Sequence, residues 1–309
     1  MRRPLNESAA VRFDRLASLP LQPVTPARAG VAGFFRTIRD LWQHRQLLAL
    51  LVRRDVKARY KDSVLGMLWT LINPLVQLAV YFLVMGQILG AARGIPDFAV
   101  YIFSGLTIYG LFSEMLSGGT GSIVANAGLV KKVFVPREIF PLSVAGSSLF
   151  TFGVQLIVLI VASLTLGTPN ISWSVLYFFP SVLLILIYGL AFSLLLSALN
   201  VYMRDVQYLT QVLLMLMLWA SPIVYAWTMV SNVISTFHLP TWLLEVYTAS
   251  PLTLAVLGFH KAFWGGGTPA DFPPDLLLRM TVAGLVGLVL LVLCQRAFSR
   301  LQGNFAQEL

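Results

Sequence analysis

Charged residues are scarce in this chain of 309 residues: only 11% are Asp, Glu, Lys or Arg, whereas 57% are hydrophobic. Soluble domains carry roughly a quarter charged residues, so this balance excludes an ordinary soluble domain. Each helical membrane span needs about 20 mostly apolar residues. The composition therefore predicts an integral membrane protein whose apolar segments form one membrane domain.

Cysteine and histidine are also scarce, which removes several kinds of chemistry. The chain has one cysteine, Cys294, so it can form no internal disulfide and offers no thiolate cluster for a metal. His44, His238 and His260 fall in three separate segments and show no metal-ligand spacing. The sequence suggests no Ser-His-acid arrangement either. We therefore expect neither a metal site nor such a catalytic triad.

A phosphate-binding loop is missing as well, because the pattern G-x-x-x-x-G-K-[ST] occurs nowhere in the chain. We therefore expect no ATP binding in the usual loop-and-helix cradle, and no cofactor in this chain. The N-terminus carries charges but no apolar core of the length that a signal peptide requires, so we expect no cleavage there.

The positive charge that is present lies mostly near the start of the sequence. Of the 22 Lys and Arg, 13 lie in residues 1–61, and the formal net charge is +9. Clustering at one end suits an anionic membrane leaflet better than a nucleic-acid groove, so we expect no nucleic-acid partner. Residues 1–33, rich in Arg, Pro and Ala, are expected to form a cytoplasmic arm without regular structure.

Residues 34–62 are predicted to form an amphipathic interface helix. Its apolar arc includes Leu47, Leu51, Val52, Val56, Ala58 and Tyr60, and its basic face includes Arg53, Arg54, Lys57 and Lys61. Asp55 and Arg59 lie inside the apolar arc, four residues apart, a spacing at which opposite charges can pair on a helix. Two interpretations stay open: a pair satisfied within the helix, or polar contacts to a neighbouring span or subunit.

Residues 63–309 are predicted to form a six-span domain, so the expected fold is an all-α membrane protein. The spans are expected at about 64–90, from about 98 to the glycine-rich segment near 118, twice between 139 and 203, at 208–225 and at about 275–295. Residues 118–138 are expected to be a cytoplasmic loop. With both chain ends in the cytoplasm, only Arg93, Lys261 and Arg279 among the Lys and Arg lie outside, which satisfies the positive-inside rule.

Two features inside this domain stand apart from the spans. Glu114 lies in the second span, where a carboxylate is costly, so it should face protein or water; a structural position near the inner interface is equally open. Ser250–Gly267 begins with a serine cap and a proline and ends at three glycines, which predicts a helix too short to cross a membrane. We expect a re-entrant or interfacial helix there, between spans five and six, acting in an outer gate.

Three segments together resemble the permease subunits of ABC type 2 exporters of bacterial polysaccharides such as O-antigen, capsule and teichoic acid. They are RRDVKARYKDSVLGMLWTLINPLVQ, NAGLVKKVFVPREIFPLS and LNVYMRDVQ. The resemblance implies a permease that exports a lipid-linked polysaccharide from the cytoplasm across the bacterial inner membrane. It also implies a homodimer working with two copies of a separate ABC ATPase, which binds the ATP and Mg²⁺. The arm formed by residues 1–33 has no counterpart in the family pattern.

The same resemblance assigns roles to particular residues. It implies that the basic face of the interface helix meets lipid headgroups and the ATPase, while its apolar face beds against the bilayer and the first span. A coupling helix within 126–136 and the turn at 204–205 would contact the ATPase through Asn126, Leu129, Lys131, Lys132, Arg137, Arg204 and Asp205. Side chains that would line the translocation path are Tyr81, Tyr109, Phe112, Glu114, Trp219, Tyr225 and Trp227, most of which offer aromatic faces to sugar rings.

Other functions stay open at this point. An ABC type 2 permease for a drug or a lipid would share the spans and the missing phosphate loop. A membrane glycosyltransferase would suit the aromatic content, but the outer loops offer few carboxylates for acid–base catalysis: Asp97, Glu245, Asp271 and Asp275. A scaffold without transport activity would show no dependence on ATP.

Overall fold

A computed structural model describes residues 39–59, 65, 68–88, 90, 94–132, 135–168 and 172–309, and these residues are helical without strands. The expected arm, Lys61 and Arg93 lie outside the described residues. Within the described ranges, five helices are long and apolar enough to cross a membrane. They are α4 (Trp69–Val80) with its π-helical continuation η2 (Tyr81–Ile88), α5 (Phe98–Ala125), α7 (Ile139–Leu166), α8 (Phe178–Tyr202) with the preceding 3-10 turn η4 (Trp173–Tyr177), and α13 (Leu276–Leu301). The predicted all-α membrane class is confirmed.

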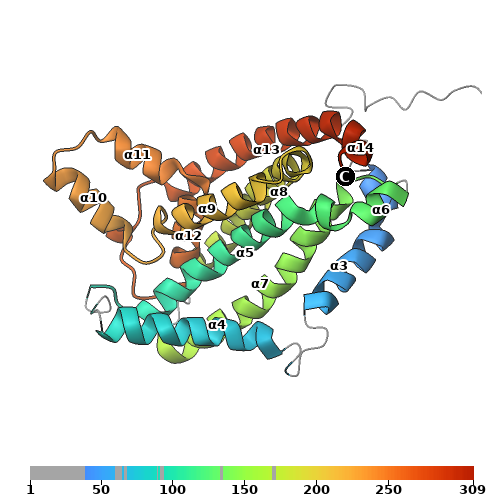
Figure 1. The fold of residues 1–309 in the computed structure, drawn as a ribbon. Helices are drawn as coiled ribbons and strands as arrows, with labels where there is room; N and C mark the ends of the chain where they lie inside the picture. Colours follow the sequence, from blue (N-terminus) through green and yellow to red (C-terminus); the bar gives the residue numbers. More distant parts are fainter. Residues whose placement is uncertain are drawn as a thin grey trace, which may run out of the picture.

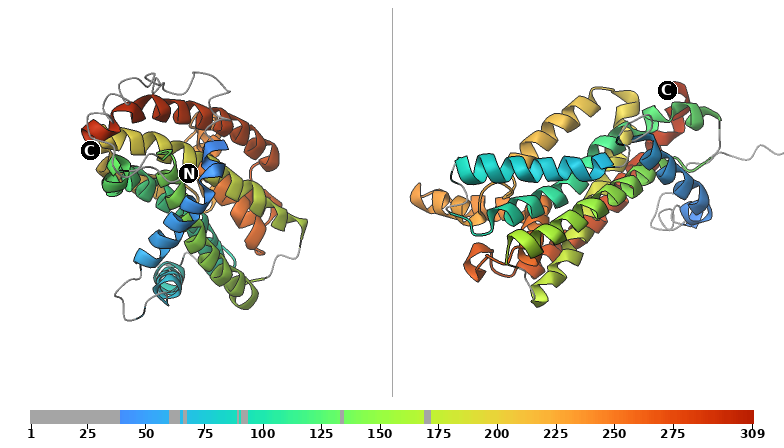
Figure 2. Two further views of the ribbon diagram at one scale, coloured as in Figure 1. Left: turned by 90° about the vertical axis from the view of Figure 1, so that its right-hand side faces the viewer. Right: turned by 90° about the horizontal axis from the view of Figure 1, so that it is seen from below.

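Shorter helices flank and join these spans. They are α3 (Arg45–Arg59), α6 (Ala127–Lys132), α9 (Val206–Trp219), α10 (Trp227–Thr236), α11 (Trp242–Ala249), α12 (Pro251–Phe263), η5 (Pro269–Asp271), η6 (Gln302–Asn304) and α14 (Phe305–Glu308). Figures 1 and 2 show α6 and α14 at one end of the bundle and α10 and α11 at the opposite end. We refer to these as the α6 end and the α10 end.

α5 is the central helix of the bundle. It lies between α13 on one side and α4 on the other (Figures 1 and 2), and it contacts α7, α8, α9 and α12. Every residue from Phe98 to Ile108 is buried. The largest apolar cluster of the molecule therefore forms around this helix.

α5 also extends further than the sequence suggests. It runs through the glycine-rich segment to Ala125, so the prediction of a loop beginning at residue 118 is wrong for residues 118–125. The glycines serve helix packing: a Cβ at Gly119 would lie 2.6 Å from the Cβ of Ser193 on α8. Ser193 Oγ donates to the Met115 carbonyl across the same contact at 2.7 Å. Small residues here allow two helices to approach closely, as is common in membrane bundles.

α9 is shorter than the fifth span predicted at 208–225. It has 14 residues and ends at Trp219, so at about 1.5 Å per residue it falls short of a core about 30 Å thick. Pro222 cannot continue a helix, because it lacks a backbone donor. The Tyr101 hydroxyl lies 3.0 Å from the Pro222 carbonyl and 2.9 Å from the Tyr225 carbonyl, so α5 fixes the irregular segment that follows α9.

α12 confirms the short helix predicted within Ser250–Gly267. Pro251 occupies its first turn, it ends at Phe263 before the three glycines, and it is bent by 75° from α11. Counted together, α11 and α12 make either one broken span, the sixth of the chain, or a re-entrant loop. Leu252, Leu254 and Leu257 are all buried, as their apolar character predicts.

A second buried apolar cluster lies at the α6 end, apart from the main core. Its buried members are Leu51, Ile123, Val130, Ile139, Phe140, Leu194, Ala198, Val201, Phe298 and Phe305. They come from α3, α5, α6, α7, α8, α13 and α14. This second cluster therefore joins α6 to six other helices.

Gly119 lies at a close helix contact, whereas Gly153 has open space beside it, so substitutions at these two glycines can be compared. Gly119→Ala should lower stability by about 1–3 kcal/mol, because the new methyl group overpacks the contact with Ser193. Gly153 on α7 has no atom within 4 Å of an added Cβ. Gly153→Ala should therefore leave stability unchanged or raise it by up to about 1 kcal/mol. Thermal unfolding in detergent measures both; equal shifts of the two variants would contradict this account of the packing.

Candidate functional site

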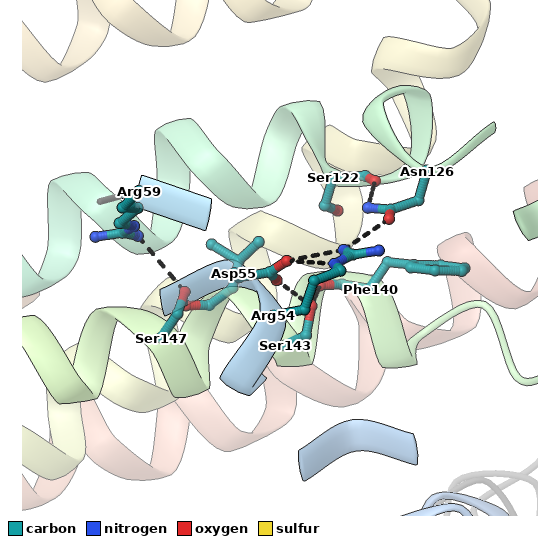
Figure 3. A network of polar contacts seen from close by, with 9 residues as sticks. Arg54, Asp55, Arg59, Ser122, Asn126, Phe140, Ser143 and Ser147 are labelled. Carbon is teal, nitrogen blue, oxygen red and sulfur yellow. Dashed lines mark hydrogen bonds and ion pairs between the residues drawn. The ribbon is translucent and has the colours of Figure 1, made fainter. Parts of the chain in front are cut away.

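Three polar residues of α3, Arg54, Asp55 and Arg59, reach side chains of α7 and of α5 or its C-terminal end (Figure 3). Arg54 Nη2 donates to Asp55 Oδ1 at 2.8 Å and to Asn126 Oδ1 at 2.8 Å. Asp55 Oδ2 accepts a hydrogen bond of 3.1 Å from Ser143 Oγ on α7. Asn126 in turn donates from Nδ2 to the Ser122 carbonyl at 2.8 Å. These bonds tie the start of α6 to α3 and to the end of α5.

Arg59, one turn further along α3, bonds to both neighbouring spans. Its Nη1 donates to Glu114 Oε2 at 3.1 Å and to Thr151 Oγ1 at 3.0 Å. Its Nη2 donates to Ser147 Oγ at 3.5 Å. We call these contacts, together with those of Arg54 and Asp55, the polar clasp of α3.

The polar clasp decides between the two interpretations that the sequence left open for Asp55 and Arg59. Asp55 and Arg59 make no ion pair with one another, so the interpretation as a pair within the helix is wrong. Each contacts a neighbouring span instead. The apolar side of α3 also differs from expectation, because it packs on α7: Leu51 joins the second cluster, and Val52 fits against Gly146. Ala58, expected on the apolar arc, is exposed.

The ion pair between Arg59 and Glu114 lies well inside the span. At about 1.5 Å per residue, Glu114 is roughly 16 Å along α5 from Ala125. An unpaired carboxylate at the centre of a bilayer costs about 2.5–3.5 kcal/mol on insertion scales. The side chains of Arg59 and Glu114 are 35% and 30% exposed, so the pair is accessible as well as satisfied.

A double-mutant cycle tests this pairing. Arg59→Gln and Glu114→Gln should show a coupling energy of about 0.5–3 kcal/mol in unfolding experiments in detergent, because the two side chains are in contact. The matched control is the cycle of Asp55→Asn with Arg59→Gln, for which we expect a value below about 0.5 kcal/mol. A larger coupling in the control cycle than in the first would contradict the polar clasp.

The residues predicted to couple to an ATPase gather at the α6 end. α6 buries Val130 in the second cluster and exposes Leu129, Lys131 and Lys132. The turn between α8 and α9 exposes Arg204 and Asp205. The hydroxyl of Tyr202, just before that turn, donates to the Leu301 carbonyl at 2.6 Å. Arg137, which follows α6, has its guanidinium carbon 5.6 Å from the ring centre of Phe305.

Glu138 belongs to this region, although no motif in the sequence singles it out. It precedes α7 and is only 4% exposed. Burial raises the pKa of its carboxyl group, and hydrogen bonds from Gln295 and Ser299 together with the charge of Arg137 reduce that rise. The partners Gln295 and Ser299 come from α13, far along the chain. No local pattern could therefore have predicted this buried carboxyl group.

The residues predicted to line a translocation path lie in different surroundings. Phe112 is buried in the large apolar cluster around α5, and the partly buried Tyr81 packs against that cluster. Tyr109 donates to the Leu214 carbonyl at 2.7 Å. Trp219 is exposed, and the half-buried Tyr225 donates to its carbonyl at 2.8 Å. Trp227 donates to Thr248 at 3.1 Å, beside the α10 end.

α5 leaves one small and polar face accessible, which the sequence analysis missed apart from Glu114. We call it the polar strip; it consists of Gly110, Ser113, Glu114, Ser117, Gly118 and Gly121, all half-buried or exposed. These positions recur every three or four residues and so share one helix face. A Cβ at Gly110 would lie 3.3 Å from Gln155 Oε1 of α7, and one at Gly121 would lie 3.7 Å from the Gln207 amide of α9. Hydrogen-bonding groups therefore border the strip on both sides.

Comparison with known proteins identifies the family. Residues 46–264 match the pattern of the ABC-2 type transporter family. The chain is 36% identical over 190 residues to the O-antigen export system permease protein RfbA of Myxococcus xanthus, covering 62% of this chain and 72% of that protein. It is 28% identical over 265 residues to RfbA of Klebsiella pneumoniae, covering 85% of this chain and 95% of that protein. A shorter match is to the polysialic acid transport protein KpsM of Escherichia coli. It is 32% identical over 81 residues and covers 26% of this chain and 31% of that protein. The chain is a multi-pass membrane protein that belongs to the ABC-2 type transporter family.

Proposed function

We propose that this chain is the permease subunit of an ATP-driven exporter that moves a lipid-linked polysaccharide from the cytoplasm across the bacterial inner membrane. The observation that carries the proposal is its similarity, over 85% of its length, to an O-antigen export permease. The match to a polysialic acid transport protein supports the same class of substrate. In this proposal two copies of the chain work with two copies of a separate ABC ATPase, which holds the ATP and Mg²⁺.

The α6 end is the proposed contact with the ATPase, on the cytoplasmic side with both chain ends. The exposed side chains of Leu129, Lys131 and Lys132 would enter the partner, and Arg204 and Asp205 would contact it at the neighbouring turn. Asn126 links this surface to α3 through Arg54. Movement of α6 would therefore be passed to α3 as well as to α5. Arg53 and Lys57, exposed on the other side of α3, would meet lipid headgroups.

The polar strip of α5 is the proposed wall of the translocation path, facing the second copy of the chain. Hydroxyl, carboxylate and amide groups suit the hydroxyls of a sugar chain. Glu114 lies in the middle of this strip with Arg59 as its partner. The exposed Trp219 and the half-buried Tyr225 would offer aromatic faces nearer the α10 end, where α12 would form part of an outer gate.

Charge reversal on α6 tests the proposed function. Lys131→Glu combined with Lys132→Glu should lower polysaccharide export by about tenfold or more, the effect of losing roughly 1.4 kcal/mol of interaction. ATP hydrolysis by the partner should continue, because its nucleotide site is untouched. Arg300→Glu reverses a single charge at an exposed position of α13 and should export normally.

Two results would contradict the proposal. One is normal export by the variant with both lysines reversed, measured as glycan at the cell surface. The other is ATP hydrolysis at the full rate by this chain purified without a partner.

A further inference from the structure

α6 is too short to hold its own position. It has six residues, which is less than two turns, and isolated helices of that length are not stable in water. Its exposed side carries Leu129 and both lysines, so only its inner side can hold it in place. On that side Val130 is 6% exposed and belongs to the second cluster. The bonds of Asn126 hold the start of α6, and the orientation of the rest of the helix depends on what fills this cluster.

Phe305 is the residue that α14 contributes to the buried part of the second cluster. It is fully buried, and α14, which begins with this residue, contacts both α6 and α8. Its ring packs edge-on against Phe298 of α13 at 5.6 Å between centroids and against Tyr202 of α8 at 6.2 Å. The guanidinium of Arg137 lies 5.6 Å from the same ring, near enough for a cation–π contact.

The backbone beside this ring is fixed in the same way. The hydroxyl of Tyr202 donates to the Leu301 carbonyl at 2.6 Å, where α13 passes into the η6 turn. This bond holds the turn that brings α14 back toward α6. Figure 1 shows α14 and α6 side by side at this end of the bundle.

We propose that Phe305 is a positioning residue for the coupling helix: through α14 it braces α6 from behind and so fixes the direction in which Leu129, Lys131 and Lys132 point. The brace rests on the proposed function only for its consequence in export. The positioning of α6 by Phe305 concerns this chain alone. Loss of the ring would leave a cavity beside Val130, and α6 would take up several orientations.

Spin-label distances in the purified chain, without the ATPase, test the brace directly. In a Cys294→Ala background, one label pair replaces Lys131 and Arg204, and a control pair replaces Arg204 and Arg300. Phe305→Ala should broaden the distance distribution of the first pair and leave the control pair unchanged. Phe305→Leu, which keeps most of the apolar volume and protects folding, should broaden the first pair less. Gln307→Ala, at an exposed position of α14, should change neither pair.

The brace would be overturned if Phe305→Ala and Phe305→Leu left the first pair as narrow as before. It would equally be overturned if both pairs broadened together, because that result means general loosening rather than positioning of α6.

In the assembled exporter, Phe305→Ala should lower export by about tenfold, as charge reversal of the lysines does. Broadening of the first pair with normal export would support the brace and contradict the proposed role of α6 instead.

Discussion

The burial of α5 is the constraint on which the rest of the structure depends. α7, α8, α9 and α12 all pack on it, and every residue from Phe98 to Ile108 is buried. In lipid there is little hydrophobic drive between helices, so such packing relies on close van der Waals contact and on hydrogen bonds between helices. The contact of Gly119 with Ser193 and the bonds from Tyr101 to the segment after α9 are of this kind. They fix α5 in place, and the polar strip of this helix stays accessible.

The position of α5 also determines where charge can lie in an apolar bundle. Glu114 on the polar strip needs a partner, and Arg59 reaches it only because α3 packs on α7 with Val52 against Gly146. The same packing brings Arg54 to Asn126, at the start of α6. The basic residues of α3 therefore have different roles. Arg54 and Arg59 close the polar clasp, whereas Arg53 and Lys57 take no part in it.

Features governed by local signals were predictable from the sequence. Ser250, Pro251 and the three glycines mark the limits of α12, and the structure has the helix where those signals place it. The apolar runs are also local signals, and they predicted the long helices. The position of the irregular segment after α9 was not predictable, because it is held by the hydroxyl of Tyr101, which lies 121 residues before Pro222.

The candidate site shows the same division. Charges on α3 and α6 could be singled out by their spacing, but their partners could not. The local spacing of Asp55 and Arg59 suggested a pair, whereas contacts to Ser143 and Glu114, distant in sequence, prevail in the structure. The polar strip was hidden for another reason: its glycines and serines looked like the end of a helix. The spacing of three and four residues would have revealed it.

Cysteine labelling can measure whether water reaches the polar strip of α5 and is kept from the buried faces of the same helix. In a Cys294→Ala background, single cysteines at Ser113 and Ser117 lie on the polar strip, and single cysteines at Thr107 and Thr120 lie on the buried faces of the same helix. A hydrophilic thiol reagent applied to membranes that contain the assembled transporter should label the first two positions and leave the other two unlabelled. Labelling of Thr107 and Thr120 as fast as that of the strip positions, or protection of all four, would contradict a central helix that turns one polar face to water.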